Sequence, residues 1–183
     1  MAANARTIDP KLEPRLADGS LAGQWTLDPS RSSVALQSKS MWGMAPVKGS
    51  FSEVSGRAII SPSGEASGTI TVGSASIDTK NAQRDKHLRS ADFFLSDKHP
   101  QIVFTAQQVT LGDDGASATG TLQVRDRTRP LTVPVAVCAL DDDAIQLDAT
   151  VHIDRSDFGL TWNRIGMASM KNTLTVRAVL TRS

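Results

Sequence analysis

A strict alternation of apolar and polar residues runs through the chain from Trp25 onward. A period of two is typical of a β-strand with one buried face, because successive side chains point to opposite sides of the sheet. In AIQLDATVHID (144–154), for example, every second residue from Ile145 to Ile153 is apolar. The same pattern occurs in seven further segments: 32–42, 47–60, 69–77, 101–109, 118–126, 130–140 and 173–181. The sequence therefore predicts about eight strands.

Short clusters of turn-forming residues separate these strands: SPSGE (61–65), GDDG (112–115), RTRP (127–130) and DDD (141–143). Connections of this length join neighbouring strands as hairpins, so we expect an antiparallel sheet with one apolar face. Such a sheet buries that face either as a sandwich or as a closed barrel. Several strands exceed the usual length of about 5–6 residues, and glycines are available to bend them: Gly43, Gly49, Gly56 and Gly73. We therefore predict an all-β fold, an eight-stranded antiparallel β-barrel.

One stretch, NAQRDKHLRSADFF (81–94), breaks the alternation. It is rich in charged residues that a helix tolerates, and Asp78 or Thr79 could cap its start. Its apolar face is thin, so it does not suit a position inside a core. We expect one short helix across an edge or end of the barrel, held there by Leu88 and the two phenylalanines that close the stretch.

Charge and cysteine content exclude several classes of protein. The chain has 20 Lys and Arg residues against 19 Asp and Glu residues, a formal charge of +1. Nucleic-acid-binding proteins usually show a clear basic excess, so we expect no nucleic-acid partner. The single cysteine, Cys138, excludes an internal disulfide and lies opposite the apolar face of its strand, where we predict an unreactive thiol. No segment approaches the roughly 18 apolar residues of a transmembrane helix.

The first 22 residues are polar, charged and contain prolines. They lack the apolar stretch of about 7–15 residues that a signal peptide carries. We therefore predict a flexible leader over residues 1–22, a single barrel domain over residues 23–183 and a cytoplasmic location. The total of 183 residues suits one domain with its own core. The sequence leaves a homodimer open.

Motifs for catalysis are absent: there is no G-x-S-x-G, no Gly-rich phosphate loop, no H-E-x-x-H and no paired C-x-x-C. His87 and His99 could bind a metal together with Asp85, Asp92 or Asp97. A haem would need His87 or one of the methionines Met41, Met44, Met167 and Met170. The simpler interpretation makes the helix residues capping and ion-pairing groups and the methionines apolar fill. We predict no catalytic residue, no metal and no cofactor, and keep as the alternative a haem- or metal-dependent enzyme or redox module that uses His87 and His99.

A charged residue ends the apolar face of one strand. Arg155 has the same parity as Val151 and Ile153, so it would point inward if that strand continued. A buried charge is costly unless it is paired or meets a polar group of a ligand. The alternative is that the strand ends before Arg155, which then reaches water.

Several segments resemble the successive motifs of the YceI-like family: WTLDPSRSSV (25–34), VKGSFSEVSG (47–56), SIDTKNAQRDKHLRSADFF (76–94), HPQIVFTA (99–106), RTRPLTVPV (127–135) and RSDFGLTWN (155–163). The resemblance runs from about residue 23 to the C-terminal end. It implies a lipocalin-like, eight-stranded barrel that binds a polyisoprenoid or a similar long apolar molecule, with the helix lying against the barrel. It also implies a carrier rather than an enzyme.

Two departures from the family pattern leave the identity of the lipid open. The family often has His after Lys in the first strand, where this chain has Lys39 and Ser40. The last loop usually carries an acidic residue, and here it reads MASMKNTLTV. Many relatives are exported to the periplasm.

The predicted function is non-catalytic binding of a polyisoprenoid, an isoprenoid quinone or a comparable apolar lipid inside the barrel. The wall would come from the inward strand faces: Val34, Leu36, Trp42, Phe51, Ile70, Phe104, Leu122, Val133, Val135, Leu147, Val151 and Ile153. Aromatic residues would line or gate one end: Phe93, Phe94, Phe158 and Trp162. Arg155 would meet a polar head group. A barrel filled by its own side chains remains the structural alternative.

Overall fold

Backbone hydrogen bonds join the alternating segments into one antiparallel sheet in the computed structural model, which describes residues 8–112 and 115–183. Its strands are β1 (Gly23–Leu27), β2 (Ser33–Ser40), β3 (Ala45–Phe51), β4 (Val54–Ile60), β5 (Ala66–Gly73), β6 (Ile77–Asp78), β7 (Gln101–Gly112), β8 (Gly115–Val124), β9 (Arg127–Asp141), β10 (Ala144–Asp154) and β11 (Lys171–Arg182). The helices are α1 (Leu12–Ala17) and α2 (Ala82–Leu88), with short 3-10 turns at Ser74–Ser76, Arg155–Phe158 and Arg164–Gly166.

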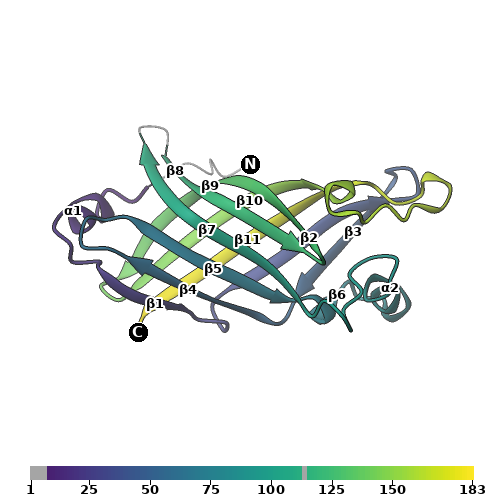
Figure 1. The fold of residues 1–183 in the computed structure, drawn as a ribbon, viewed down its shortest axis with the longest axis horizontal. Helices are drawn as coiled ribbons and strands as arrows, with labels where there is room; N and C mark the ends of the chain where they lie inside the picture. The colour runs from purple at the N-terminus through teal and green to yellow at the C-terminus, as the bar shows by residue number, and fades with distance from the viewer. Residues whose placement is uncertain (1–7, 113–114) are drawn as a thin grey trace.

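The sheet closes into a barrel of eight strands, as predicted (Figure 1). β1 and β2 act as one bent strand, because both pair with β11 on one side and with the β3–β4 segment on the other. The order is then β1/β2, β3/β4, β5, β7, β8, β9, β10 and β11, and β11 returns to β1. Pro29 and the Asp28 carboxylate, which accepts a hydrogen bond from the Ser30 N–H at 2.9 Å, interrupt the ladder between β1 and β2.

Apolar side chains of every long strand point into the barrel, which confirms the predicted parity. On β8, for example, every second residue from Ala116 to Val124 is buried, Gly120 included. Gly120 permits a close backbone approach, because an added Cβ would collide with the Thr105 carbonyl oxygen. The alternation therefore supplies a continuous apolar interior along the barrel.

Trp42 is the exception, and its prediction as a wall residue was wrong. β2 ends at Ser40, and Met41, Trp42 and Gly43 all have positive φ angles, of 52°, 56° and 88°. This turn takes Trp42 out of the strand's alternation. Its side chain is 63% exposed, and its indole N–H donates to the Ile165 carbonyl at 3.0 Å.

The N-terminal segment packs against the barrel over the part that the structure describes, so the predicted flexible leader is wrong for residues 8–22. Ile8 forms a β-bridge with Val137, and α1 follows. Leu12 and Leu21 are each only 1% exposed. The prediction failed because the segment is polar on average, although these two leucines belong to the core. Residues 1–7 of the predicted leader lie outside the described residues.

The helix predicted from residues 81–94 exists as α2, which lies at the opposite end of the barrel from α1 (Figure 1). Its cap is Asn81, whose side-chain oxygen accepts the Arg84 N–H at 2.9 Å. The predicted caps, Asp78 and Thr79, were wrong because Lys80, with φ of 62°, turns the chain before the helix starts. Within the described residues, none of the helices has the length and apolarity needed to cross a membrane.

Candidate functional site

Two cavities inside the barrel are lined by residues that the structure describes. The larger has a volume of about 300 Å³ and is bounded at one end by α2 and the 155–169 segment. Most of its wall is apolar side chain from the inward faces of the strands. The wall includes ten of the residues predicted from the sequence: Val34, Leu36, Phe51, Phe93, Phe94, Leu122, Ile153, Arg155, Phe158 and Trp162.

The second cavity, of about 140 Å³, lies toward the α1 end. Three predicted wall residues line it: Ile70, Phe104 and Leu147. Leu12 and Leu16 of α1, with Leu21 and Trp25, complete the wall at that end. These four residues were not predicted from the sequence, although the spacing of Leu12 and Leu16 is that of one helix face.

The remaining predicted wall residues, Val133, Val135 and Val151, line neither cavity. They belong to an apolar cluster with Ala116 and Ala118 on the β8–β10 side of the barrel. These side chains pack against one another and fill the barrel interior on this side. The alternation of the strands predicts that they point inward, but not whether they leave a cavity. Whether any of the predicted residues contacts a ligand stays a prediction.

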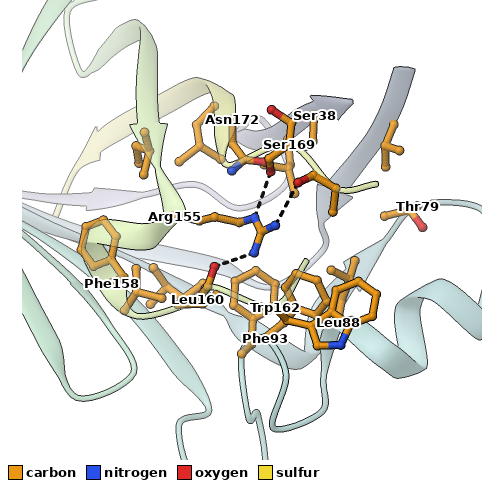
Figure 2. A pocket seen from close by; sticks show the side chains of 18 of the residues that line it. Ser38, Thr79, Leu88, Phe93, Arg155, Phe158, Leu160, Trp162, Ser169 and Asn172 are labelled. Carbon is orange, nitrogen blue, oxygen red and sulfur yellow. Dashed lines mark hydrogen bonds between the residues drawn. The ribbon is translucent and has the colours of Figure 1, made fainter. Parts of the chain in front are cut away.

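Arg155 stands at the α2 end of the larger cavity. β10 ends one residue earlier, at Asp154, yet the Arg155 side chain does not reach water: the residue is 8% exposed. Its Nε donates to the Ser169 carbonyl at 2.9 Å, one terminal nitrogen to the Leu160 carbonyl and the other to the Ala168 carbonyl at 3.2 Å. Figure 2 shows the guanidinium between Leu160 and Ser169.

The charge of Arg155 has no carboxylate in salt-bridge contact among the described residues; its guanidinium lies 5.3 Å from the centre of the Phe93 ring. Burial lowers the pKa of the Arg155 guanidinium, and the nearby Asp154 opposes that change. An arginine side chain nevertheless stays protonated in proteins. The larger cavity therefore has a buried positive charge at the end where its polar side chains gather, among them Thr79, Ser169 and Asn172.

His87 contributes to the same end of the cavity. Its Nε2 lies 2.7 Å from the Asp92 carboxylate, and its ring packs edge-on against Trp162 and Phe93, with centroid distances of 4.4 and 5.1 Å. This arrangement closes the corner between α2 and the 155–169 segment with aromatic surface.

Asp85 does not join His87. It is 6% exposed and accepts hydrogen bonds from the Thr79 N–H at 3.0 Å and the Thr79 hydroxyl at 2.6 Å. Arg84 donates to the same hydroxyl at 2.7 Å, and Arg89 donates to the Ala75 carbonyl at 2.7 Å. The charged residues of the stretch thus fasten α2 to the segment before it.

Groups suited to a metal do not gather in the part of the chain that the structure describes. No three His, Cys, Asp or Glu side chains in residues 8–112 and 115–183 lie close enough to hold an ion. Of the methionines considered as haem ligands, Met41, Met44 and Met167 are 47%, 74% and 38% exposed.

Several residues that line the larger cavity were not predicted from the sequence. Val72, Ile102 and Leu174 line the larger cavity, and each has the inward parity of its strand, so the pattern itself could have identified them. Leu160 and Met167 come from an irregular segment without periodicity, and no sequence signal marks them.

The sequence of this chain is similar to those of known proteins. The model of the YceI-like domain family matches residues 25–181. Protein YceI of Escherichia coli O157:H7 is 40% identical over 74 residues, which cover 40% of this chain and 39% of that protein. A UPF0312 protein of Pseudomonas aeruginosa is 32% identical over 107 residues, 56% of each chain. These matches thus span less than two thirds of the curated relatives' own lengths.

Solved structures share the fold. BcnA of Burkholderia cenocepacia aligns with a TM-score of 0.75 at 21% identity, over 84% of this chain and 98% of that one. A polyisoprenoid binding domain from Saccharophagus degradans aligns with a TM-score of 0.70 at 17% identity, over 87% and 98%. The Campylobacter jejuni YCEI protein aligns with a TM-score of 0.64 at 26% identity, over 75% and 85%.

Proposed function

The chain belongs to the YceI-like domain family, and from this premise we propose that it is a non-catalytic carrier which holds a polyisoprenoid, an isoprenoid quinone or a comparable long apolar lipid inside its barrel. The observation that carries the proposal is the larger cavity, about 300 Å³ with a mostly apolar wall. That volume lies at the lower end of the roughly 300–1,000 Å³ typical of small-molecule sites. The polyisoprenoid-binding description of the Saccharophagus degradans domain, which has the same fold, agrees with this proposal.

Apolar burial can supply the affinity that such binding needs. Each buried methylene-sized group contributes about 0.8 kcal/mol, so a chain of roughly 20 carbons offers on the order of 16 kcal/mol in total. Association costs on the order of 4–15 kcal/mol. A tail inside the barrel can therefore bind without a strong polar anchor.

Arg155 is the part of the site that we propose meets a polar head group. It is the buried cation at the end of the cavity where Ser169 and Asn172 also lie. Three of its five N–H groups are occupied by main-chain carbonyls, which leaves two for a ligand oxygen. The tail would then extend from this end toward the middle of the barrel.

The first experiment is organic extraction and mass spectrometry of the protein purified from its own organism, with an absorbance scan of the same sample. A stoichiometric isoprenoid or quinone is the expected result and would identify the lipid. A Soret band or a bound metal would instead favour the alternative of a haem or metal enzyme. A sample without lipid that also fails to bind added farnesol would contradict the carrier proposal. The predicted cytoplasmic location needs a separate fractionation experiment.

A pair of variants on β2 tests whether the lipid occupies the cavity. Leu36 lines the larger cavity, so Leu36→Trp places an indole in the tunnel. We expect this variant to lose lipid while remaining folded. Ala35→Trp is the matched control, because Ala35 is exposed on the outer face of the same strand. Equal lipid content in the two folded variants would place the lipid elsewhere.

A further inference from the structure

The two cavities follow one another along the barrel. Along β5, Val72 lines the larger cavity and Ile70, the next inward residue, lines the smaller one. Along β7 the same succession holds for Ile102 and Phe104. One inward step along a strand is about 7 Å. The smaller cavity is therefore the continuation of the larger one toward α1, with Ile70 and Phe104 at the junction.

The smaller cavity is also the less polar end of this path. Arg155, His87 and Asn172 all line the larger cavity. Near α1 most of the wall is apolar, with Leu12, Leu16, Ile145 and Leu147 among its residues; its polar members Arg57, Ser67 and Thr69 are exposed residues of β4 and β5. A lipid with its head group at the polar end would direct its tail into this space.

α1 ends the path, and it lies outside the part of the chain that the family model matches, which starts at residue 25. Hydrogen bonds hold α1 and the residues that follow it against the barrel, and within α1 the Arg15 side chain donates to the Asp142 carbonyl at 2.7 Å. The Trp25 indole N–H donates to the Leu21 carbonyl at 3.0 Å. Arg182 of β11 donates to the carbonyls of Ser20 at 2.7 Å and Ala22 at 2.9 Å. α1 is thus a fixed wall of this particular barrel.

We propose that the smaller cavity receives the distal end of the lipid tail, and that Leu12 and Leu16 of α1 are the stop which determines the longest tail that fits. This inference rests on the proposed carrier function. It assigns a ligand-binding and length-selecting role to residues that precede the family domain.

Dimensions along β10 give the expected length. Ile153 lines the larger cavity and Ile145 the smaller one, a separation of about 26 Å at 3.3 Å per residue. A strand tilt of about 40° reduces this to about 20 Å along the barrel axis. With C–C bonds of about 1.5 Å, an extended hydrocarbon advances about 1.3 Å per carbon, so about 15 main-chain carbons fit. Geranylgeraniol is close to this limit, and solanesol far exceeds it.

The test measures affinity by calorimetry for geraniol, farnesol, geranylgeraniol and solanesol, all presented from the same cyclodextrin carrier. For the unmodified protein, affinity should rise to geranylgeraniol and gain nothing further with solanesol. Leu16→Trp fills the end of the path. Because each buried carbon contributes about fourfold in affinity, displacing the five carbons of one isoprene unit should weaken geranylgeraniol binding by on the order of a thousandfold. Farnesol binding should change little.

Glu13→Trp is the matched control, because Glu13 is an exposed residue of α1 that lines neither cavity. Two results would contradict the proposal that Leu12 and Leu16 limit the tail length, while leaving the carrier function intact. One is the same dependence of affinity on chain length in both tryptophan variants, and the other is an affinity that still increases up to solanesol. A protein that binds none of the four alcohols would overturn the carrier function itself.

A second measurement locates the tail without changing α1. Trp162 lines the larger cavity and Trp25 the smaller one. In Trp42→Phe, Trp162→Phe protein, a long-chain alcohol of geranylgeraniol length with a bromine at its tail end should quench the Trp25 fluorescence. A farnesol-length analogue should quench it less. Absence of Trp25 quenching by the longer alcohol, when it is bound, would contradict the inference even if Leu16→Trp failed to fold.

Discussion

Single residues show how this barrel accommodates charge. Arg155 is buried with its guanidinium surrounded by main-chain carbonyls of the 160–169 segment. Asp85 is buried with both of its hydrogen bonds from Thr79. Hydrogen bonds to charged groups are stronger than those between neutral groups, at about 1.5–3 kcal/mol. Each buried charge thus fastens a segment that has no regular structure of its own.

Arg155→Lys should destabilise the protein by about 2 kcal/mol, since an ammonium cannot donate along three directions in one plane as the guanidinium does. Urea unfolding measures this loss, and hydrogen exchange should increase in residues 160–169. Arg155→Met is the comparison: Lys keeps the positive charge without the guanidinium geometry, whereas Met removes the charge as well. If Arg155 binds a head group, Lys retains more lipid than Met. Unchanged stability in Arg155→Lys would show that the carbonyl contacts contribute little.

Cys138 should be a slow nucleophile. Burial raises the pKa of its thiol, and the carboxylates of Asp148 and Asp9 raise it further. A raised pKa lowers the fraction of thiolate at any given pH, and the thiolate is the reactive form. Iodoacetamide should therefore modify the folded protein more slowly than the protein in urea, with the rate-against-pH curve displaced to higher pH. Equal curves in the two states would contradict this.

Among the elements, α2 depends on a polar attachment more than on its thin apolar face. Asn81 caps its start, and Asp85 and Arg84 both bond to Thr79, which is 4% exposed. Leu88 adds the apolar contact that was predicted, since it packs against two of the core clusters. The stretch that supplied candidate metal ligands in the sequence therefore positions the end wall of the cavity.

Asp85→Ala should cost about 1–3 kcal/mol, because it leaves the buried Thr79 N–H without its acceptor. Asp85→Asn keeps an acceptor oxygen and should cost less. Asp92→Ala is the control on the same stretch: its carboxylate is 48% exposed beside His87, and such surface pairs contribute about 0–1 kcal/mol. Thermal unfolding of the three variants gives their order of stability. An Asp92→Ala protein less stable than Asp85→Ala would contradict the importance of the buried carboxylate.

At the scale of the whole molecule, the seam between β1 and β11 completes the barrel, and Trp25 stands at this seam. It is 1% exposed, it pairs across the seam with Arg182, and the Arg182 guanidinium lies 4.8 Å from the indole ring centre. Its indole N–H also bonds to Leu21. One side chain thus connects the first strand, the last strand and the α1 segment.

Trp25→Ala should destabilise the protein by about 3–5 kcal/mol, the usual cost of removing a large buried aromatic side chain. Trp42→Ala is the matched control. Its indole is 63% exposed, so the expected change is within about 0.5 kcal/mol. Chemical denaturation of the two variants measures the difference. Similar denaturation midpoints would mean that the contacts of Trp25 between β1 and β11 contribute little to the stability of the protein.

Particular residues show where sequence reasoning succeeded and failed. The inward parity of Val34, Leu122 and Ile153 was predictable because a strand fixes the direction of each side chain relative to its neighbours. Trp42 was misplaced because a turn with positive φ ended that relation. α1 was missed because one pair of leucines at helical spacing, Leu12 and Leu16, in a polar helix of six residues is too short a repeat to stand out.

The sequence by itself determined the strands, their apolar faces and the antiparallel pairing of neighbouring strands, because alternation and turn chemistry are local properties of consecutive residues. Only the tertiary structure decided that β11 returns to β1, that α1 closes one end, that Arg155 bonds to carbonyls five to fourteen positions away and that the interior contains two cavities. The same valines and leucines could equally fill a barrel. Whether they leave space depends on the summed volumes of side chains from distant segments, and no local pattern contains that sum.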